Sequence, residues 1–569
     1  MNNVQQHSIK QALKTLSLIL AFGLLTGLLS GCAKPQPDML IIDNVQGYSF
    51  DNDRQLFEFS ALAVSEGRVV QTGDATLAAQ YPEAKIHDGQ GKTLLPGLID
   101  AHGHISSLGY ALLSLDVRGL DSAQTTAEAA ADYASKNPAL SWVQGRGWNQ
   151  VLWSDNQYPT AATLDAVITD RPVWLERIDG HAGWANQKAM ALAGITKDTI
   201  SPEGGEIIHD AQGEPTGIFV DNAMSLIIGV IPKPSDVEIT LALDAVSKHL
   251  LSLGITSAHD AGVLSNEHKV YRKIADSGDM QVRIYGMYSS SESDLEEVLA
   301  AGHSNDPSDM YSMRSIKVYT DGALGSRGAA MLAPYSDRPD HSGLLLTSSA
   351  ELRRLFALAI NAEFQIAIHA IGDKGNRIGL DEIEQAYATE GGRHLRHRME
   401  HAQVVAPVDI PRFKTLDVIP SMQPTHATSD MNMAEDRIGA ERLKGAYAWQ
   451  TFLNQGSRLV SGSDFPIELA NVFHGIHAAV TRQNKSNQPQ AGWIGEEAMN
   501  LEDTMRSFSI DAAWAAHQED RLGGLTPGKW ADFILIDQDI YKIPAQDIWK
   551  TQVLETWLAG DLVYSNAPR

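Results

Sequence analysis

Two histidines separated by one residue, His102 and His104, end an apolar stretch that begins near Thr93. In an extended chain, residues i and i+2 point to the same face, so both imidazoles can reach one metal ion. Barrel and open-sheet enzymes carry their catalytic residues at the carboxyl ends of parallel strands. The pair therefore suits a metal site, although a surface loop with two chance histidines would show the same pattern.

Four further polar positions lie in or directly after apolar runs. They are Lys317 within 315–319, His369 after 366–368, His401 after Met399-Glu400, and Asp464 after 460–463. Each has an ordinary alternative, since a histidine at a strand end can be structural and an aspartate can cap a helix. Lys317 is the most unusual, because lysine is almost never fully buried without a partner. Together, on successive predicted strands, these residues indicate a metal-dependent catalytic centre.

The elements that would position these residues alternate between strands and helices, a pattern typical of βα units around a parallel sheet. Predicted strands cover 173–175, 254–258, 282–285, 315–319, 364–369, 397–400, 418–422 and 459–461, and predicted helices cover 238–253, 349–362 and 501–516. A segment at about 121–235 is rich in Trp, Gly and Pro and interrupts the alternation. We expect it to be an insertion that covers the mouth of a barrel.

Short strand patterns lie at both ends of the chain, before residue 94 and after residue 515. They predict a small β-sandwich domain built from 39–94 and 515–569, flanking a barrel of residues 95–514. A length of 569 residues suits a barrel with a second domain. The formal net charge of −25 argues against a nucleic-acid partner, whose phosphates would be repelled.

The first 31 residues have the features of a secretory signal, with Lys10 and Lys14 as their only charges and an apolar run from 16 to 29. The end of this run resembles the lipobox of bacterial lipoproteins, so we expect lipidation at Cys32 and a linker over 32–38. An uncleaved membrane anchor is the alternative, but the run is short for a span of about 20 residues. The expected location is a bacterial cell envelope, with a lipid anchor in the membrane. Ala33 and Lys34 are compatible with an outer membrane and a body that faces the periplasm.

Cys32 is the only cysteine, so an internal disulfide is excluded. Stability must come from packing, and a bound metal could add to it.

Across nearly the whole mature chain the sequence resembles the amidohydrolase superfamily, closest to amidohydrolase family 3, the branch that contains N-substituted formamide deformylase. The likeness rests on motifs in a common order, at 95–104, Gly180-His181, 320–327, 369–373, 400–403, 462–466 and 525–532. It implies an α/β fold, a distorted TIM (β/α)8 barrel with a small β-sandwich domain formed from both chain ends. It also implies a hydrolase that acts on carbon–nitrogen bonds other than peptide bonds.

The resemblance further implies which residues hold metal. His102 and His104 would bind one divalent ion, His369 and His401 a second, and a CO2-derived carbamate on Lys317 would bridge them. Asp464 would contact the first ion and hold the proton of the attacking water. Two zinc ions are the leading expectation, and Mn, Fe or Co would suit similar ligands.

The implied reaction is hydrolysis of an amide, N-substituted formamide or cyclic amide by a metal-activated hydroxide, with Asp464 as proton donor to the leaving nitrogen. His181 would polarise the carbonyl or bind the substrate's tail. Other expected substrate contacts are His259, Arg327 and His426. Two alternatives stay open: a mononuclear deaminase without a bridging lysine, and a non-catalytic envelope lipoprotein that binds ligands. A homodimer is the ordinary expectation for the oligomeric state.

Overall fold

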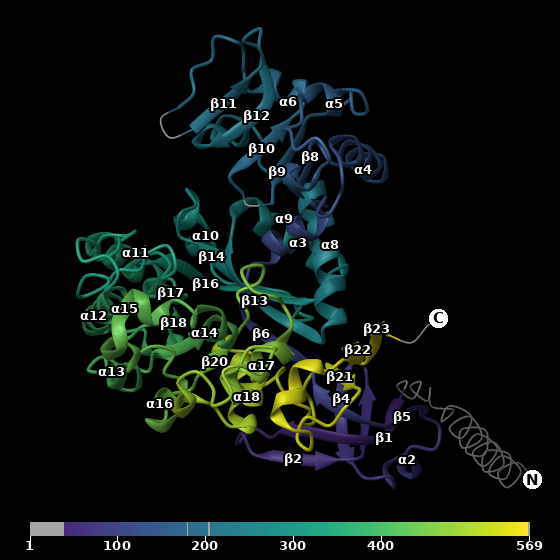
Figure 1. The fold of residues 1–569 in the computed structure, drawn as a ribbon. Helices are drawn as coiled ribbons and strands as arrows, with labels where there is room; N and C mark the ends of the chain where they lie inside the picture. The colour runs from purple at the N-terminus through teal and green to yellow at the C-terminus, as the bar shows by residue number, and fades with distance from the viewer. Residues whose placement is uncertain (1–38, 179, 203–204, 567–569) are drawn as a thin grey trace, which may run out of the picture.

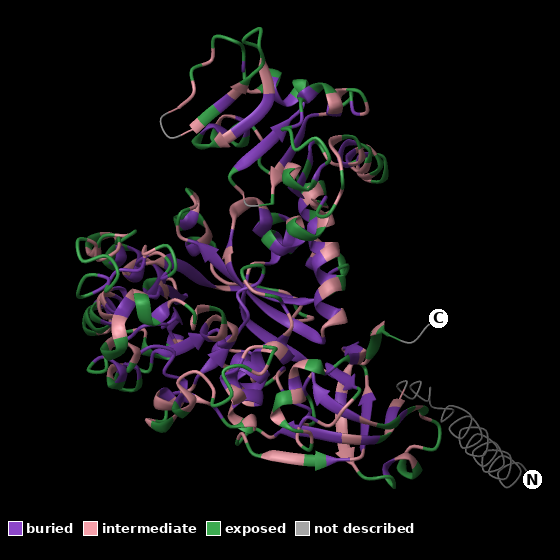
Figure 2. Ribbon diagram, in the orientation of Figure 1, coloured by how far each residue is buried: buried purple, intermediate pink, exposed green. Residues whose placement is uncertain are grey.

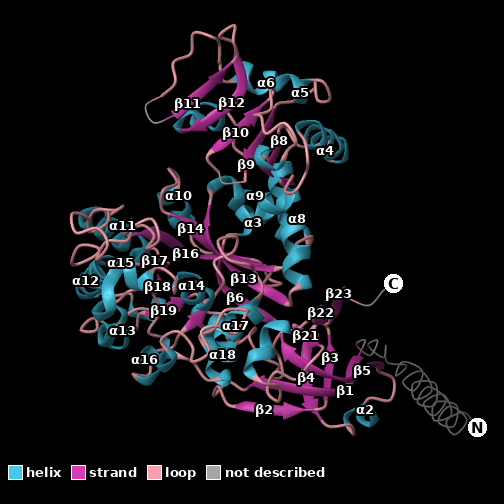
Figure 3. Ribbon diagram, in the orientation of Figure 1, coloured by secondary structure: helices cyan, strands magenta, loops and turns pink. Residues whose placement is uncertain are grey.

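The computed structural model describes residues 39–178, 180–202 and 205–566, which form three sheets with helices around them (Figure 3). The predicted signal peptide, the linker and the lipidation site at Cys32 lie outside the described residues. Within the described part of the chain, no helix is both long and apolar enough to cross a bilayer.

A nearly closed barrel of eight parallel strands forms the centre of the molecule (Figure 1). Its strands, in spatial order, are β6 (Leu98–Gly103), β13 (Ile255–Val263), β14 (Arg283–Ser289), β16 (Tyr311–Tyr319), β17 (Gln365–Ala370), β18 (Arg398–His401), β19 (Ile419–Met422) and β20 (Val460–Ser461). The short strand β15 (Ser304–Asn305) pairs with β16. The ring approaches closure where Gly103 bridges Phe465 and the Asp464 N–H donates to the His102 carbonyl over 2.7 Å. This arrangement confirms the predicted α/β barrel.

Helices follow or flank the barrel strands: α3 (Ile105–Leu113), α8 (Asp236–Ser252), α9 (Ser265–Ser277), α10 (Leu295–Ala301), α11 (Ser349–Asn361), α12 (Asp373–Thr389), α13 (Ile410–Leu416), α14 (Pro424–Asp430), α15 (Ala434–Leu443), α16 (Trp449–Asn454), α17 (Val472–Thr481), α18 (Leu501–Ser507) and α19 (Ile510–Ala515). Helix α8 begins at a capping box in which Ser235 and Glu238 bond to each other's backbone N–H groups. The helix predicted over 501–516 is two helices in the structure. They are separated at Phe508 and Ser509, and the backbone of Ser509 is not helical. The barrel strands are buried, because helices cover their outer faces (Figure 2).

Strands from both chain ends form one hydrogen-bonded sheet beside the barrel. Its strands are β1 (Met39–Phe50), β2 (Leu56–Phe59), β3 (Ala61–Ser65), β4 (Arg68–Gly73), β5 (Lys85–Pro96), β21 (Phe533–Ile536), β22 (Val553–Leu558) and β23 (Asp561–Ser565), with helix α2 (Leu77–Gln80) after β4. β21 pairs antiparallel with β5, so that Phe533 lies opposite Pro96. The expected meeting of the two chain ends is therefore seen, while the sandwich architecture and the domain boundaries stay predictions.

The residues that lie between β6 and β13 in the sequence form a third sheet. It contains β7 (Leu115–Asp116), β8 (Val143–Trp148), β9 (Val173–Arg177), β10 (Ala182–Ala185), β11 (Gly205–His209) and β12 (Pro215–Asp221), together with α4 (Ala123–Lys136), α5 (Ala161–Asp165), α6 (Gln187–Leu192) and α7 (Ser225–Ile228). It has hydrophobic clusters of its own, around Trp148 and Trp174. In Figure 1 this layer lies beyond α3 and α9. The predicted strand 173–175 belongs to this sheet and not to the barrel.

Candidate metal centre

A cavity of about 340 Å³ lies at the carboxyl ends of the barrel strands. Its lining includes six of the site residues expected from the sequence, either as metal ligands or as a substrate contact: His104, Lys317, His369, His401, His426 and Asp464. His102 is fully buried beside them, with its Nε2 3.4 Å from Lys317 Nζ. The barrel thus brings together side chains that are hundreds of residues apart in the sequence.

The side chains of this group are close enough to share a cation. Ligand atoms of His102, His401 and Asp464 all lie within 4.8 Å of one another. Asp464 Oδ1 is 3.1 Å from His104 Nε2 and 3.6 Å from His102 Nε2. The His369 and His401 rings are 4.5 Å apart between centroids. Imidazole nitrogens and a carboxylate in such an arrangement match the ligand preferences of zinc and similar divalent ions.

Two histidines are oriented by hydrogen bonds at Nδ1, and we call the residues that form these bonds their outer partners. His102 Nδ1 bonds to Glu400 Oε2 over 2.5 Å, and His401 Nδ1 bonds to Gln423 Oε1 over 2.8 Å. Because each acceptor holds the proton on Nδ1, the Nε2 lone pair of each ring is left available. Outer partners of this kind fix the tautomer and orientation of metal-binding histidines.

Glu400 is itself held by a buried arginine. Arg398 Nε lies 2.8 Å from Glu400 Oε1, and Nη2 donates to Oε2 over 3.2 Å. Burial alone would raise the pKa of Glu400, but Arg398 and His102 outweigh it and hold that pKa below its usual range. Glu400 is therefore a carboxylate that accepts from both neighbours.

Lys317 lies in the barrel interior, with its Nζ 3.4 Å from His102 Nε2. Within the described residues it forms no ion pair with a carboxylate, although it is almost entirely buried. Burial is the main cause that lowers the pKa of its amine to about 8. A larger neutral fraction of this amine follows, and only the neutral amine is nucleophilic.

The donor set fits a bound cation. Three buried atoms at the cavity, His369 Nε2, His426 Nε2 and Asp464 Oδ1, have no hydrogen-bond partner. A buried polar atom without a partner costs about 1–3 kcal/mol, and a cation is a suitable partner for imidazole nitrogen and for carboxylate oxygen. Burial also lowers the pKa of His102 to about 4 and of His369 to about 3, so both rings are neutral near pH 7, as metal binding requires.

The backbone at two of these residues is in the left-handed region, with φ of 74° at His401 and 62° at Asp464. Such conformations are uncommon for residues other than glycine and cluster at functional sites. Asp100 secures the second of them, because its carboxylate accepts from the Ser463 backbone N–H and from the Ser463 hydroxyl, the latter over 2.7 Å. The loop that carries Asp464 is thereby tied to β6.

The other expected substrate contacts are placed differently. His426 lines the cavity, and its Nε2 is 3.5 Å from Asp464 Oδ2. His259 is buried below the cavity, where its Nδ1 accepts from Arg398 over 2.9 Å.

Two expected site residues lie away from the cavity. The Arg327 guanidinium pairs with Asp337 over 2.8 Å. His181 belongs to the third sheet's layer, where its largely exposed ring pairs with Asp221 over 2.7 Å. The structure does not bring Arg327 or His181 to the metal centre, and their roles stay predictions.

Reasoning from the sequence assigned no role to Glu400, Gln423, Arg398 or Asp100. A local signal exists for the first, since Glu400 is a charged residue inside the short buried strand β18 and precedes a predicted ligand. No local signal marks Gln423, whose partner comes from another strand.

Residues 85–564 match the amidohydrolase family. The chain belongs to this family. Among relatives of this amidohydrolase, Protein LONG AFTER FAR-RED 3 of Arabidopsis thaliana is 32% identical and covers 92% of the chain and 91% of its own length. Its name states no reaction. N-substituted formamide deformylase of Arthrobacter pascens is a more distant relative, 27% identical over 89% of the chain and 94% of its own length.

A solved structure gives the same result for the fold. An uncharacterized metal-dependent hydrolase from Pyrococcus furiosus superposes on this amidohydrolase with a TM-score of 0.74 at 27% identity, covering 89% of this chain and all of that one. The expected membership of amidohydrolase family 3 is confirmed, and with it a hydrolase fold and a small-molecule substrate.

Proposed function

We propose that this amidohydrolase is a metal-dependent enzyme that hydrolyses a carbon–nitrogen bond in a small amide, N-substituted formamide or cyclic amide. The observation that carries the proposal is the convergence of four histidines, Lys317 and Asp464 on one cavity, with Nε2 atoms of His102 and His401 left available by their outer partners. The printed names of the relatives, a metal-dependent hydrolase and a formamide deformylase, support the same class.

In this proposal, His102 and His104 hold one divalent ion and His369 and His401 hold a second, with zinc as the expected metal. Lys317 would carry a CO2-derived carbamate and so contribute oxygen ligands for the metal. A buried lysine beside two dications and without a carboxylate partner is unfavourable as a cation, whereas a carbamate provides compensating negative charge. When bound, the metals would lower the pKa of a water molecule and polarise the substrate carbonyl.

Side chains of the protein then transfer the proton and exclude water. Asp464 has one carboxylate oxygen beside His104 and the other facing His426, so it can take a proton at Oδ1 or Oδ2 and pass it to the leaving nitrogen. Apolar wall residues of the cavity, including Leu324 and Ile371, keep bulk water from the reacting groups. A cavity of about 340 Å³ admits a small molecule.

The proposal is tested on chain lacking residues 1–32, purified without chelator. Elemental analysis should find about two metal equivalents per chain, and a panel of formamides, N-acyl amines and cyclic amides should contain a substrate. Asp464→Asn should retain metal but lose roughly 10²–10⁴-fold in kcat, because the proton acceptor is gone. Full activity in Asp464→Asn would refute the assignment; one equivalent would favour the deaminase, and none with an intact fold would favour a binding protein.

A further inference from the structure

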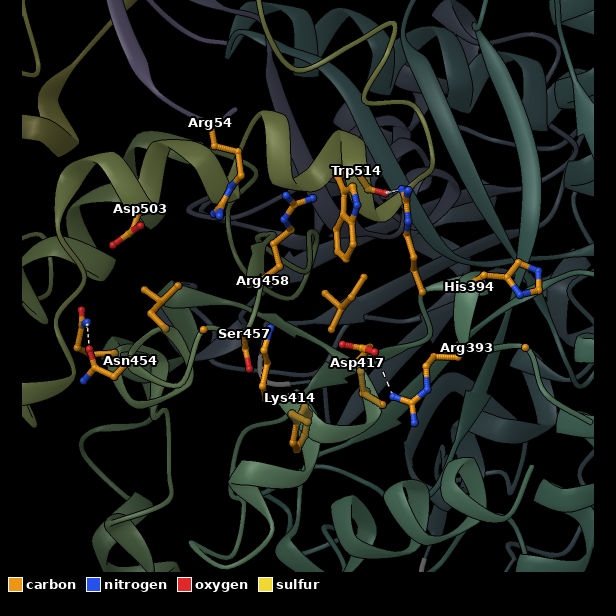
Figure 4. A pocket seen from close by; sticks show the side chains of 18 of the residues that line it. Arg54, Arg393, His394, Lys414, Asp417, Asn454, Ser457, Arg458, Asp503 and Trp514 are labelled. Atoms are coloured by element: carbon orange, nitrogen blue, oxygen red, sulfur yellow. Dashed lines mark hydrogen bonds and ion pairs between the residues drawn. The ribbon is translucent and has the colours of Figure 1, made fainter. Parts of the chain in front are cut away.

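A second cavity lies at the other end of the barrel from the metal centre. It has a volume of about 1170 Å³ and is bounded by the residues that lead into three barrel strands (Figure 4). Arg396 precedes β18, Val418 precedes β19 and Arg458 precedes β20. The carboxyl ends of these strands carry or lead to His401, Gln423 and Asp464, so the length of the barrel separates the two cavities.

Positive charge is concentrated in this cavity. Its basic lining residues are Arg54, Arg393, His394, Arg396, Lys414 and Arg458, whereas its acidic ones are Asp417 and Asp503. The chain as a whole has a formal net charge of −25. Carboxylates beside the cavity, including Asp511 and Glu519, offset part of this charge, and the positive charge that is left favours anions.

Most of these cations already have partners. Arg396 bonds to both carboxylate oxygens of Glu519, over 2.7 and 3.1 Å. Arg54 Nη2 bonds to Asp511 over 2.8 Å. These pairs fix the walls of the cavity and offer a ligand little additional donor capacity.

Arg458 is the most loosely paired of the arginines, because it forms an ion pair with Asp511 but no hydrogen bond to it. Its nearest carboxylate oxygen, Asp511 Oδ1, is 3.5 Å away, and that oxygen has no hydrogen-bond partner. The guanidinium instead lies over the indole of Trp514, 4.3 Å from the ring centroid, and Arg396 lies 4.7 Å from the same centroid. A guanidinium carries five N–H donors in a planar fork, so stacking orients Arg458 and leaves its donors available.

Lys414, on α13, supplies a second available cation. Its side chain is exposed, and within the described residues it forms no ion pair with a carboxylate. A Cβ placed on Gly456 would be 4.0 Å from Lys414 Nζ, so the ammonium lies beside the turn that leads to Ser457 and Arg458. Figure 4 shows Lys414, Ser457 and Arg458 at the same part of the cavity.

We propose that this cavity is a second ligand site, which binds a small organic phosphate. Arg458 would donate two parallel N–H bonds to phosphate oxygens, the geometry for which guanidinium is best suited, and Lys414 would add a point charge. The volume exceeds what one phosphate group needs, and the partly buried Leu453 and Trp514 offer contacts for an organic body. The site is independent of the metal centre and of the reaction proposed there.

The test is calorimetric titration of the metal-loaded protein with inorganic phosphate at constant ionic strength. Phosphate also has affinity for dinuclear metal centres, so the discriminating comparison is between variants. Lys414→Glu should weaken the phosphate affinity at least tenfold. Lys197→Glu makes the same charge change at an exposed lysine in the third sheet's layer and should alter the affinity less than twofold.

Arg458→Lys retains the positive charge but loses the planar fork, and it should also weaken binding at least tenfold. If that variant fails to fold, Lys414→Glu decides alone, since an exposed side chain can be replaced with little structural cost. Phosphate binding that is equal in wild type and Lys414→Glu would locate the anion elsewhere and overturn the proposal, as would equal weakening by Lys414→Glu and Lys197→Glu. Absence of any saturable binding to the wild type would also overturn it.

Discussion

Glu400→Gln is the substitution that most directly tests how the metal centre is held. Glu400 is fully buried, accepts from His102 and from Arg398 Nη2, and forms an ion pair with Arg398 Nε. Glutamine has nearly the same shape, but it removes the negative charge and turns one accepting oxygen into an N–H donor. That donor must then face either the Arg398 guanidinium or the His102 ring.

Two losses of different size are expected. Removing one partner of a buried ion pair costs about 3–5 kcal/mol of unfolding free energy, because Arg398 is left buried without its counter-charge. Removing the outer partner of a metal-binding histidine costs about 10–100-fold in metal affinity, which corresponds to about 1.4–2.8 kcal/mol. Urea unfolding of the metal-free protein measures the first, and zinc titration against a competing chelator measures the second.

Asp532→Asn is the matched control. Asp532 pairs with the buried Arg283 over 2.6 and 3.0 Å, at a site that contains none of the proposed metal ligands. It should lose a similar amount of stability and keep its affinity for zinc. If Glu400→Gln binds zinc as tightly as the wild type, Glu400 does not orient His102 and our reasoning about the outer partners is wrong.

Two further predictions concern Lys317 and a buried histidine. Lys317→Ala should reduce the metal content from about two equivalents to one or fewer and lower kcat at least roughly 100-fold, with partial recovery in millimolar acetate; two equivalents and normal rates without acetate would refute the bridging carbamate. His397 accepts from the Ile366 N–H over 3.0 Å, and burial is the main cause that lowers its pKa from 6.5 to about 3. Below pH 6.5 the unfolded chain therefore binds a proton that the folded chain does not, so stability falls as the pH falls. Between pH 7 and pH 5 the wild type should lose about 2 kcal/mol more unfolding free energy than His397→Asn, measured by urea denaturation. Equal losses of unfolding free energy in both proteins would show that His397 does not cause this pH dependence.

The sequence predicts those features that depend on local pattern. Buried parallel strands are apolar runs, and a polar residue at the end of such a run is visible without any structure. His369 and His401 could therefore be found, and both line the cavity. The apolar pattern of a strand indicates its extended conformation but not the neighbouring strand with which it pairs. It therefore cannot predict which sheet the strand joins. The strand 173–175 is correctly predicted as a strand within the expected insertion, but the pattern does not show that it pairs in a separate sheet.

Long-range pairing could not be predicted. The Glu400 carboxylate matters because its partner, His102, comes from a strand 298 residues earlier. Arg398 would be expected at a surface from its type alone, yet it is fully buried among polar partners. These cases share one cause, which is that the energy of a buried charge is set by neighbours that the linear sequence does not identify.

The pairing of β5 with β21 has a consequence for how the chain is made. In the antiparallel ladder Leu95 lies opposite Ile534, so one of the two strands leaves the ribosome before the whole barrel and the other after it. At roughly 5–20 residues per second, β5 waits about 20–90 s for its neighbour. During that time one edge of an apolar strand is open to other nascent chains. The polypeptide is thus most prone to aggregation until its last strands have been synthesised. Chains truncated before β21 should therefore depend most on chaperones.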